Sequence, residues 1–575
     1  MPSAIEIKSP EFEEGLKLLK DNKFDQSIEF GQNWLKNDPE NLNAYLLLSL
    51  AYLGKGQEGG MLDQVKKVHA IKPQYNAIIF ATAASFYATK NHFYKALDYY
   101  EQSRKIEEIP WVVTEIAKIY QGRGQLRKAR EYYEKNQDDA NLGRIYLAEN
   151  NCAKAIGHAL KAIEKDKQNA GMYIILASCN LQTGNFELAQ ENYLKLKAFD
   201  PEKSFVADYY LGLVDLVNKK YDIAQKRFDD ALRNTPKAKE LNIAAAFISH
   251  NNGDFSKAKQ YASRANTSDP NDFLGYLALA DIFVSENNYL KADQTFKKAK
   301  ILFPEFSLPG FKSADFFDSG VPSEPASLTL ANILYREGLF AQVLTLDKKS
   351  KNPFILMTKA RAEMKLGNTE KAKAYYQEVI GRHPALFTAF MELGSIHASK
   401  SENTQAISMY EKAGQIDRNN IKPLMALADL YYNSGKIDES LRKYEQIIAK
   451  SPNSAIGYNQ AAWVLSEDKK KYDEALTYAR KGIKAAPDDM NMQDTLGWIY
   501  YRLGKYSDAL KSYKYFSETG RGTPSNLYHL GMIHEKLNKQ EMAGKLFEKA
   551  LDMSDDFPEV SDTEKRFKVL TQNNN

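Results

Sequence analysis

The 575-residue sequence has little cysteine, little net charge and no long run of apolar residues. Its two cysteines, Cys152 and Cys179, are too few for a disulfide framework, and a chain of this size does not need one. The formal net charge is only +4. The longest uncharged stretches, 41–54 and 169–186, contain polar residues and fall short of a membrane-spanning helix. We therefore expect no nucleic-acid partner and no direct insertion into a membrane.

Signals for secretion and for catalysis are also missing. Residues 1–6 show no basic region followed by an apolar run, which predicts a cytoplasmic protein, or a periplasmic one if a signal peptide has been removed. None of the eight histidines stands at a metal-ligand spacing. No phosphate-binding glycine loop, nucleophile elbow or zinc-protease helix occurs. We predict that the chain is not an enzyme and has no catalytic residues, no metal and no cofactor.

What the sequence does contain is a period of 34 or 35 residues. Prolines recur with this period over 201–304. Alanines recur with it over 189–292 and, with one serine, over 372–543. Two residue classes therefore show the same internal repeat. The repeating positions are Pro201, Pro236, Pro270 and Pro304; Ala189, Ala224, Ala258 and Ala292; and Ala372, Ala406, Ser440, Ala475, Ala509 and Ala543.

One unit shows what each position does. Residues 173–184 carry apolar residues at helical spacing, and Gly184 ends this predicted helix. Asn185 is a predicted N-cap of a second helix, which stops before Pro201. Small alanines let the two helices approach closely, and one aromatic position fills the space between them, which explains why the chain has 35 Tyr and 28 Phe but only 4 Trp. The aromatic position is occupied by Tyr100, Tyr133, Tyr193, Phe228, Phe296, Tyr376, Tyr410, Tyr444, Tyr513 and Phe547.

These units resemble the tetratricopeptide-repeat (TPR) family. The match is close at 496–500, Leu-Gly-Trp-Ile-Tyr, followed by Gly504, Ala509 and Tyr513. The resemblance implies an all-α fold, a right-handed α-α superhelix of about sixteen helix–turn–helix units. A short unit is expected near 141–162 and a poor one at 327–346.

The period fails after Pro304, where a stretch containing Pro, Gly and Phe interrupts the array. We predict an N-terminal array over 1–304, a packed connector over 305–325 and a C-terminal array over 326–555. An extended linker remains the alternative for the connector. The tail, 556–575, is predicted to form a capping helix that covers the last repeat with Val560, Phe567, Val569 and Leu570.

In the TPR family the first helix of each unit lines the groove in which partners bind. In the N-terminal array this lining is mostly apolar: Leu46, Leu50, Leu53, Ile78, Ile174, Tyr209, Leu213, Leu216, Phe247 and Leu277. In the C-terminal array, amides alternate with aromatic anchor residues. The predicted partner-binding residues are Asn459, Trp463, Asn491, Asp494, Trp498, Tyr501, Arg502, Tyr528 and His529. Trp463 and Trp498 are the predicted hot spot; the alternative is that both rings only fill the layer between helices.

The resemblance implies a non-enzymatic scaffold that binds proteins or peptides. The paired Lys and Asn residues of a chaperone-tail clamp are absent, since apolar residues such as Phe12, Leu16 and Leu46 stand at those positions. Residues 461–465 and 496–513 are similar to repeats of bacterial exopolysaccharide and secretion proteins, which leaves an envelope assembly factor as an alternative. A regulatory subunit of an enzyme complex is a second alternative, and homo-oligomerisation stays open.

Overall fold

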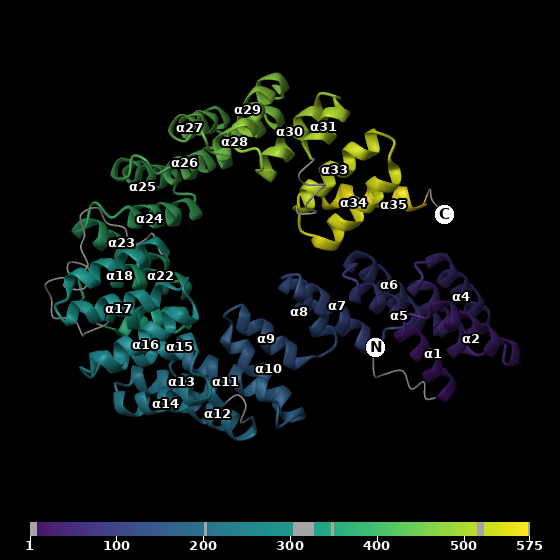
Figure 1. Cartoon of the computed structure of the whole chain (residues 1–575), viewed down its shortest axis with the longest axis horizontal. Coiled ribbons are helices and arrows are strands. Elements are labelled where there is room, and N and C mark those ends of the chain that lie inside the picture. The colour runs from purple at the N-terminus through teal and green to yellow at the C-terminus, as the bar shows by residue number, and fades with distance from the viewer. Residues whose placement is uncertain (1–8, 201–203, 303–326, 347–349, 514–521, 573–575) are drawn as a thin grey trace. The chain divides into compact units, whose positions relative to one another are not determined.

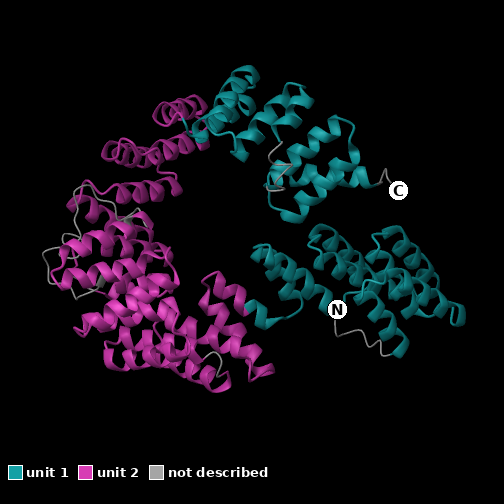
Figure 2. Cartoon of the chain, in the orientation of Figure 1, with its two compact units in different colours: residues 1–142, 453–575 teal, residues 143–452 magenta. Residues whose placement is uncertain are grey.

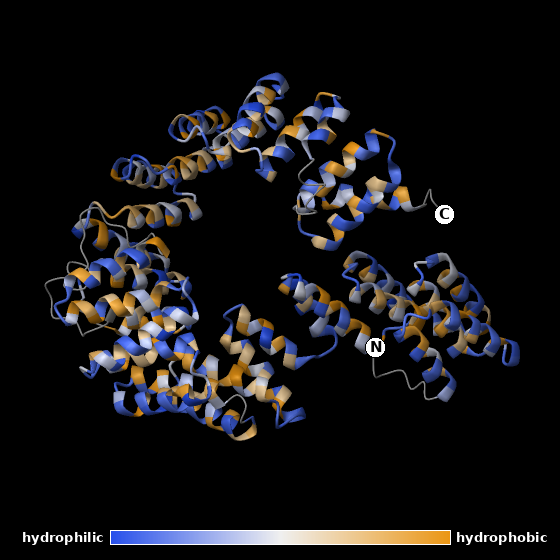
Figure 3. Cartoon of the chain, in the orientation of Figure 1, coloured by the Kyte–Doolittle hydropathy of each residue, from blue (hydrophilic) through white to orange (hydrophobic). Residues whose placement is uncertain are grey.

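The computed structural model is all-α, as the sequence predicts. It describes residues 9–200, 204–302, 327–346, 350–513 and 522–572, and every regular element in these ranges is a helix (Figure 1). Consecutive helices pair, and we call the first helix of a pair the A helix and the second the B helix. Figure 3 shows hydrophobic residues spread over both helices of the pairs, as expected when each pair packs against its neighbours.

The described helices fall into two compact units, and each is considered by itself (Figure 2). Unit 1 contains Met1–Leu142 and Asn453–Asn575, and unit 2 contains Gly143–Pro452. The first segment of unit 1 contains α1 (Pro10–Lys20), α2 (Phe24–Asn37), α3 (Leu42–Gly54), α4 (Glu58–Ile71), the 3-10 helix η1 (Pro73–Tyr75), α5 (Asn76–Thr89), α6 (Phe93–Ile106), α7 (Pro110–Gly122) and α8 (Leu126–Lys135). Its second segment contains α28 (Ala455–Glu467), α29 (Tyr472–Ala485), α30 (Met490–Arg502), α31 (Tyr506–Ser512), α33 (Pro524–Lys536), α34 (Gln540–Met553) and α35 (Val560–Gln572).

Unit 2 begins within α9 (Asp139–Ala148). It then contains α10 (Cys152–Lys165), α11 (Ala170–Gln182), α12 (Phe186–Phe199), α13 (Ser204–Val217), α14 (Tyr221–Asn234), α15 (Lys239–Asn251), α16 (Phe255–Ser268), α17 (Phe273–Ser285), α18 (Tyr289–Leu302), α20 (Ser327–Arg336), α21 (Phe340–Thr345), α22 (Pro353–Lys365), α23 (Thr369–Arg382), α24 (Phe387–Ser399), α25 (Asn403–Ile416), α26 (Lys422–Asn433) and α27 (Ile437–Lys450). The division into arrays at 1–304 and 326–555 stays a prediction; within unit 2, α20 packs on α15 and α17. The predicted connector, 305–325, lies wholly outside the described residues.

A single residue in the left-handed backbone region separates the A helix from the B helix in each pair. Sixteen pairs of the described chain show this turn, with φ between 55° and 82°. The turn residues are Asn22, Gly56, Asn91, Gly124, Asn150, Gly184, Lys219, Gly253, Asn287, Gly338, Gly367, Ser401, Gly435, Lys470, Gly504 and Asn538. Successive turns are 33–35 residues apart except at Asn150, which lies in the predicted short unit, and at Gly338 and Gly367, which follow the predicted break. The turns agree with the predicted number of units.

The turn at Gly184 confirms one prediction and corrects another. Gly184 follows α11 with a φ of 82°, a conformation that costs glycine little. Asn185 occupies the N-cap position of α12, but its side chain does not cap the helix. Its amide donates instead to the Thr183 hydroxyl oxygen over 3.1 Å, which ties the turn to the end of α11.

The predicted core positions are buried throughout. All ten Ala or Ser residues of the period and all ten aromatic residues of the predicted inter-helix position lie in the core. Their fit is close: a Cβ atom added to Gly497 would lie 2.2 Å from Tyr513, and one added to Gly212 would lie 2.3 Å from Phe228. The A helix therefore needs a small residue where the aromatic ring of the B helix crosses it.

We expect the substitution Ala224→Leu to lower the free energy of unfolding by about 1–3 kcal/mol, because three carbon atoms would be forced into a filled contact. Ala224 is fully buried in α14, whereas its neighbour Ile223 is half exposed. Urea unfolding followed by circular dichroism measures the change, with Ile223→Leu as the control. Equal midpoints for the two variants would show that the predicted repeat register is wrong.

In unit 2 the apolar stripe of the A helices is covered by the chain itself. The helix pair α20–α21 shares one core with α13, α15 and α17, and its own buried residues are Leu328, Leu330, Ile333, Leu334, Leu339 and Val343. The stripe residues buried in that core are Tyr209, Leu213, Leu216, Phe247 and Leu277. The N-terminal groove is therefore not an open apolar surface at these residues.

Polar contacts hold α20–α21 in place. The Arg336 guanidinium donates two hydrogen bonds, of 2.7 and 2.8 Å, to the Asp272 carboxylate at the start of α17. The Glu337 carboxylate accepts hydrogen bonds from the hydroxyls of Tyr209 (2.9 Å) and Tyr210 (3.1 Å). The Gln342 amide donates to the carbonyl oxygen of Leu181 over 3.0 Å. Bidentate and charged bonds of this kind fix one orientation of the helix pair.

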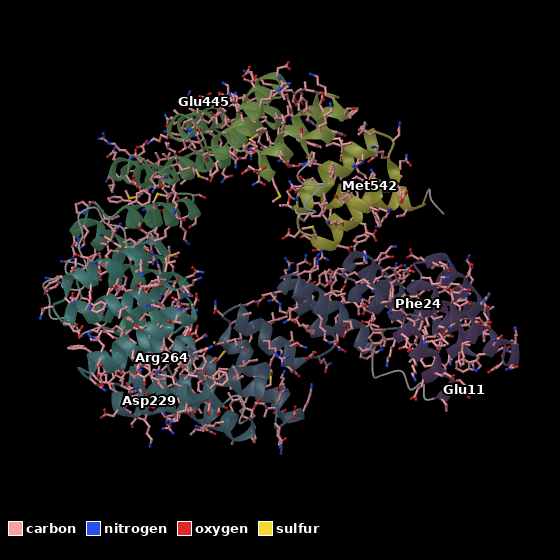
Figure 4. The ribbon with its side chains drawn as sticks, in the orientation of Figure 1. Glu11, Phe24, Asp229, Arg264, Glu445 and Met542 are labelled. Atoms are coloured by element: carbon pink, nitrogen blue, oxygen red, sulfur yellow. The ribbon has the colours of Figure 1, made fainter. Side chains whose placement is uncertain are left out.

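B helices of unit 2 are also linked to one another. Figure 4 labels Asp229 of α14 and Arg264 of α16. The Tyr261 hydroxyl donates to Asp229 over 2.5 Å, and the Arg264 guanidinium lies 5.9 Å from the centre of the Tyr261 ring. These contacts join the B helices of neighbouring repeats, whereas α20 packs on the A helices α15 and α17.

The C-terminal segment ends in α35, a helix where the tail was predicted to cap the last repeat. Phe567 and Leu570 are buried in a core shared with α34, as expected for a cap. Val569 was predicted to join them but is 50% exposed, because it lies on the opposite face of α35. Phe567 also packs edge-on against Tyr94 of α6, with ring centres 5.6 Å apart.

Candidate protein-binding surface

The nine predicted partner-binding residues lie on three A helices of unit 1, namely α28, α30 and α33 (Figure 1). The repeat aligns them in two rows. Asn459, Asp494 and His529 are 35 residues apart and form a polar row, while Trp463 and Trp498, also 35 apart, form an aromatic row. Side chains at equivalent positions of successive repeats lie side by side, so both rows cross the same face.

The start of each of these helices is fixed by a cap. The Ser454 hydroxyl accepts a hydrogen bond from the N–H of Ile456 in α28, and the Asp489 carboxylate accepts one from Met492 in α30. Thr523 and Asn526 form a reciprocal capping box at α33. A fixed start sets which residues of the following helix face the neighbouring repeat.

The aromatic residues form a continuous stack. Trp498 lies parallel to Tyr501 with ring centres 4.8 Å apart, and it also stacks on His529 at 4.1 Å. Trp463 lies 6.3 Å from His529 in a tilted arrangement. Trp498 is only 9% exposed, whereas Trp463 and Tyr501 are half-buried and can touch another molecule.

Asp494 is the centre of a buried hydrogen-bond network. Its carboxylate accepts a bond of 2.5 Å from the Tyr513 hydroxyl and one of 3.0 Å from Nδ1 of His529. Burial alone would lower the pKa of His529, but the charge and hydrogen bond of Asp494 outweigh it, so the pKa of His529 is raised above 6.5. Burial and the same carboxylate raise the pKa of Tyr513 well above 10. Asp494 and His529 thus join α30 to α33, which is a structural role.

Two predicted residues, Arg502 and Tyr528, have partners of their own. The Arg502 guanidinium lies over the rings of Trp498 (6.0 Å) and Tyr472 (5.6 Å), and it comes within 3.5 Å of the Glu467 carboxylate. The Arg502 side chain nevertheless keeps 31% of its surface exposed. Tyr528 is buried and donates a bond of 2.8 Å to Asp562 of the capping helix.

Asn459 is the polar residue left with spare bonding capacity. Its side-chain oxygen is buried and has no hydrogen-bond partner among the described residues. Asn491 is exposed at the second position of α30, about two helical turns before Trp498. The predicted residues therefore separate into a buried set (Asp494, Trp498, Tyr528 and His529) and an accessible set (Asn459, Trp463, Asn491, Tyr501 and Arg502).

Sequence reasoning missed Glu467 and Tyr472, which position Arg502. It also missed the one group of the described chain that could hold a metal ion, His92, Glu548 and Asp552, whose ligand atoms all lie within 4.8 Å of one another. No spacing motif could indicate it, because 456 residues separate its first two members. Asp552 accepts hydrogen bonds from the Tyr94 N–H (2.8 Å) and pairs with His92 (3.1 Å). These bonds join α6 to α34 without a metal.

The fold and the site together define an all-α solenoid of repeated helix pairs with a mixed aromatic and amide face. A family model described as Tetratricopeptide repeat matches residues 141–203, 357–420 and 425–489, and a second model with the same description matches residues 524–557. These matched residues of the chain are tetratricopeptide repeats.

The individual proteins that this chain is similar to include two that are named for this repeat. The chain is 24% identical over 451 residues to the TPR repeat-containing protein MJ1428 of Methanocaldococcus jannaschii, covering 74% of this chain and 77% of that protein. It is 31% identical over 106 residues to the TPR repeat-containing protein PA4667 of Pseudomonas aeruginosa, covering 17% and 18% of the two chains. Among solved structures it is similar to yeast Tom70, with 14% identity, a TM-score of 0.33 and coverage of 87% and 96%. No helix of the described residues has the length and apolar character needed to cross a membrane.

Proposed function

We propose that this TPR protein is a non-enzymatic scaffold that holds a protein partner along α28, α30 and α33. The observation that carries the proposal is the half-buried ring of Trp463 beside Asn459, whose side-chain oxygen is buried without a partner. A buried acceptor of this kind is satisfied by an N–H group from a bound backbone. An accessible Trp next to it is a common anchor for an apolar side chain of the partner.

The partner class that fits is a peptide or an extended protein segment with one apolar anchor residue. The anchor would contact Trp463 and Tyr501, and Asn459 would accept a backbone N–H once its side chain turns to bring the buried oxygen to the surface. Arg502 keeps part of its side chain exposed, where a carboxylate of the partner can reach it. Trp498 supports this surface from below by stacking on Tyr501 and His529.

The C-terminal helices are favoured over the apolar groove predicted nearer the N-terminus. In unit 2 the helix α20 packs on α15 and α17, and Leu213, Phe247 and Leu277 are buried in the core that it shares with them. In unit 1, Leu46, Leu50 and Leu53 of α3 are buried as well. An open mixed surface, and not a closed apolar one, supports the assignment of partner binding to α28, α30 and α33.

We expect Trp463→Ala to weaken partner binding by about 2 kcal/mol, or roughly thirtyfold, and to lower stability less than the loss of the more buried Trp498 does, because Trp463 is only partly buried against the core. The partner is first isolated by tagging the chain in its native host, crosslinking, and identifying copurifying proteins by mass spectrometry. Its affinity for each variant is then measured by calorimetry. Ile456→Ala, an exposed position of the same helix, is the matched control.

Trp498→Ala serves as a second comparison. Because Trp498 is 9% exposed, its loss is expected to lower the free energy of unfolding by about 3–5 kcal/mol and to reduce binding only through misplaced neighbours. Unchanged binding by Trp463→Ala would contradict the proposed surface. The partner's identity distinguishes a general scaffold from an envelope assembly factor or a regulatory subunit, and self-association without another partner would indicate a homo-oligomeric platform.

A further inference from the structure

Three possible metal ligands gather in unit 1 where α6 packs on α34. His92 is the residue just before α6, whereas Glu548 and Asp552 are four residues apart on α34 and therefore share one face of that helix. One ligand atom of each side chain lies within 4.8 Å of the other two. Nδ1 of His92 lies 3.1 Å from Oδ2 of Asp552. Two ligands of one tetrahedral zinc ion, each about 2.1 Å from the metal, are roughly 3.4 Å apart, so a small inward movement of the Glu548 side chain completes the group.

The His92 and Asp552 side chains are held in place by their neighbours. Asn91 has a left-handed backbone, with a φ of 61°, and sets His92 at the N-cap position of α6. The His92 ring does not cap the helix; it packs edge-on against Tyr87 with ring centres 6.2 Å apart. Oδ1 of Asp552 accepts a hydrogen bond of 2.8 Å from the Tyr94 N–H, which leaves Oδ2 for His92. Ligands that are oriented in this way bind a metal ion more tightly.

The two carboxylates carry negative charge that nearby basic groups do not neutralise. Lys95 comes no closer than 3.9 Å to Glu548. Burial and, to a smaller degree, the charge of Glu548 raise the pKa of Asp552. A bound cation would relieve this repulsion. Other basic groups around the site have bonds elsewhere: Lys95 with Glu58 (2.8 Å), Lys545 with Glu541 (2.6 Å) and Arg123 with the Leu551 carbonyl oxygen (2.9 Å).

The same three side chains line a pocket of about 670 Å³. The pocket gives water access to the place where an ion would lie. The side chains of Asp552 and Glu548 are nevertheless only 11% and 22% exposed, so the protein shields most of both carboxylates. Three protein ligands with an open position for water is the arrangement of many zinc sites.

We propose that His92, Glu548 and Asp552 bind one zinc ion, with water as the remaining ligand. An imidazole nitrogen suits zinc, whereas Ca²⁺ and Mg²⁺ prefer six or more oxygen ligands. The ion takes the lone pair on Nδ1 of the neutral His92 ring, whose proton is then on Nε2, and it replaces the hydrogen bond between His92 and Asp552.

The bound ion would link the two segments of unit 1. His92 belongs to the first segment, and Glu548 and Asp552 belong to the second. The hydrogen bonds that Asp552 makes to His92 and Tyr94 already join them, and zinc would strengthen this junction. Because none of the nine predicted partner-binding residues belongs to the group, the metal site is independent of the proposed partner-binding surface.

The test uses the full chain, freed of metal by dialysis against EDTA and then against metal-free buffer, with Zn²⁺ as the probe in calorimetry. We expect one ion to bind at this site, and His92→Ala and Glu548→Gln each to weaken its binding by about tenfold or more, since even the loss of an outer-shell partner costs this much. His69→Ala, which removes an exposed histidine of α4, is the matched control and should bind zinc like the natural chain. Circular dichroism confirms that the variants are folded. Absence of binding by the natural chain, or equal affinity of His92→Ala and the natural chain, would overturn the proposal.

Hydrogen exchange tests the link between the segments. We expect zinc to slow exchange in α6 and α34 of the natural chain and of His69→Ala, but not of His92→Ala. Excess Mg²⁺ should not reproduce the effect, because it lacks the preference for imidazole. Zinc binding that leaves the exchange of both helices unchanged would contradict a site between them.

Discussion

Replacing Asp281 with asparagine is expected to raise the free energy of unfolding of unit 2 by roughly 4 kcal/mol at pH 8 and by about 2 kcal/mol at pH 5. Asp281 lies in α17, and one of its oxygens has no hydrogen-bond partner in the described chain. Burial raises the pKa of its carboxyl from 3.8 to about 7. Each pH unit between these values is worth about 1.4 kcal/mol.

The direction in which stability changes with pH follows from the number of protons that the folded and unfolded chains bind. Between pH 3.8 and 7 the folded chain keeps a proton on Asp281 that the unfolded chain has lost, so the stability due to this group falls as the pH rises. His250, 3.8 Å away, has the opposite effect, because burial lowers its pKa from 6.5 to about 4, and nearby Glu286 only partly offsets this. The two groups are therefore both neutral near pH 5 to 6. Their pH slopes nearly cancel in the natural sequence, and the asparagine variant is needed to separate them.

Hydrogen exchange of peptides from α15 and α17 in increasing urea measures this effect locally, which suits a chain with two compact units. Variant and natural chains are compared at the same pH. Asp222→Asn, at an exposed position of α14, is the control and should change stability equally little at both pH values. A stabilisation that does not grow between pH 5 and pH 8 would show that Asp281 is ionised in the folded chain.

Leu334→Ala is expected to lower the free energy of unfolding of unit 2 by about 2–5 kcal/mol, because it leaves a cavity in a filled core. Leu334 lies in α20 with 0% of its surface exposed, in the same core as α13 and α15. Removing its methyl groups should weaken the packing of α20–α21 on these helices. We therefore expect hydrogen exchange to become faster in α13 and α15 as well as in α20.

The control for this change is Leu290→Ala in α18, where the side chain is 72% exposed and the expected effect is below about 0.5 kcal/mol. Faster exchange confined to α20–α23, with α13 and α15 still protected, would mean that α20–α21 does not stabilise the helices it covers. The same comparison can be made with Arg336→Met, which removes the bidentate bond to Asp272.

The helix pairs of this fold follow from the sequence because the period is strict. The spacing of Ala224 and Ala509 with their equivalents, and of Tyr193 and Tyr513 with theirs, predicts residues that the structure buries. The return of α20–α21 onto α11–α17 could not be predicted in this way. Its polar contacts join residues that are 64, 128 and 161 positions apart, which no local pattern records.

The sequence could predict which helical positions the candidate site residues occupy, but it could not predict how deeply each side chain is buried. The period places Trp463 and Trp498 on equivalent turns of α28 and α30, and the structure agrees. It does not show that Trp498 is enclosed by Tyr501 and His529, since the ring of His529 comes from the following repeat. Nor does it show that Asp494 is engaged by Tyr513 and His529. Such burial depends on neighbours in three dimensions.

The position of α20–α21 has a consequence for synthesis of the chain. A simple solenoid can fold repeat by repeat as it is made, because each repeat contacts only its neighbours. Here the Leu181 carbonyl has no bond from Gln342 until α21 has been made. Leu213 and Phe247 likewise lack the apolar residues of α20 that share their core. While ribosomes are still translating the stretch before residue 346, the A helices of α11–α17 present an uncovered apolar stripe. Nascent chains stalled before this point should therefore need chaperones that chains released after it do not.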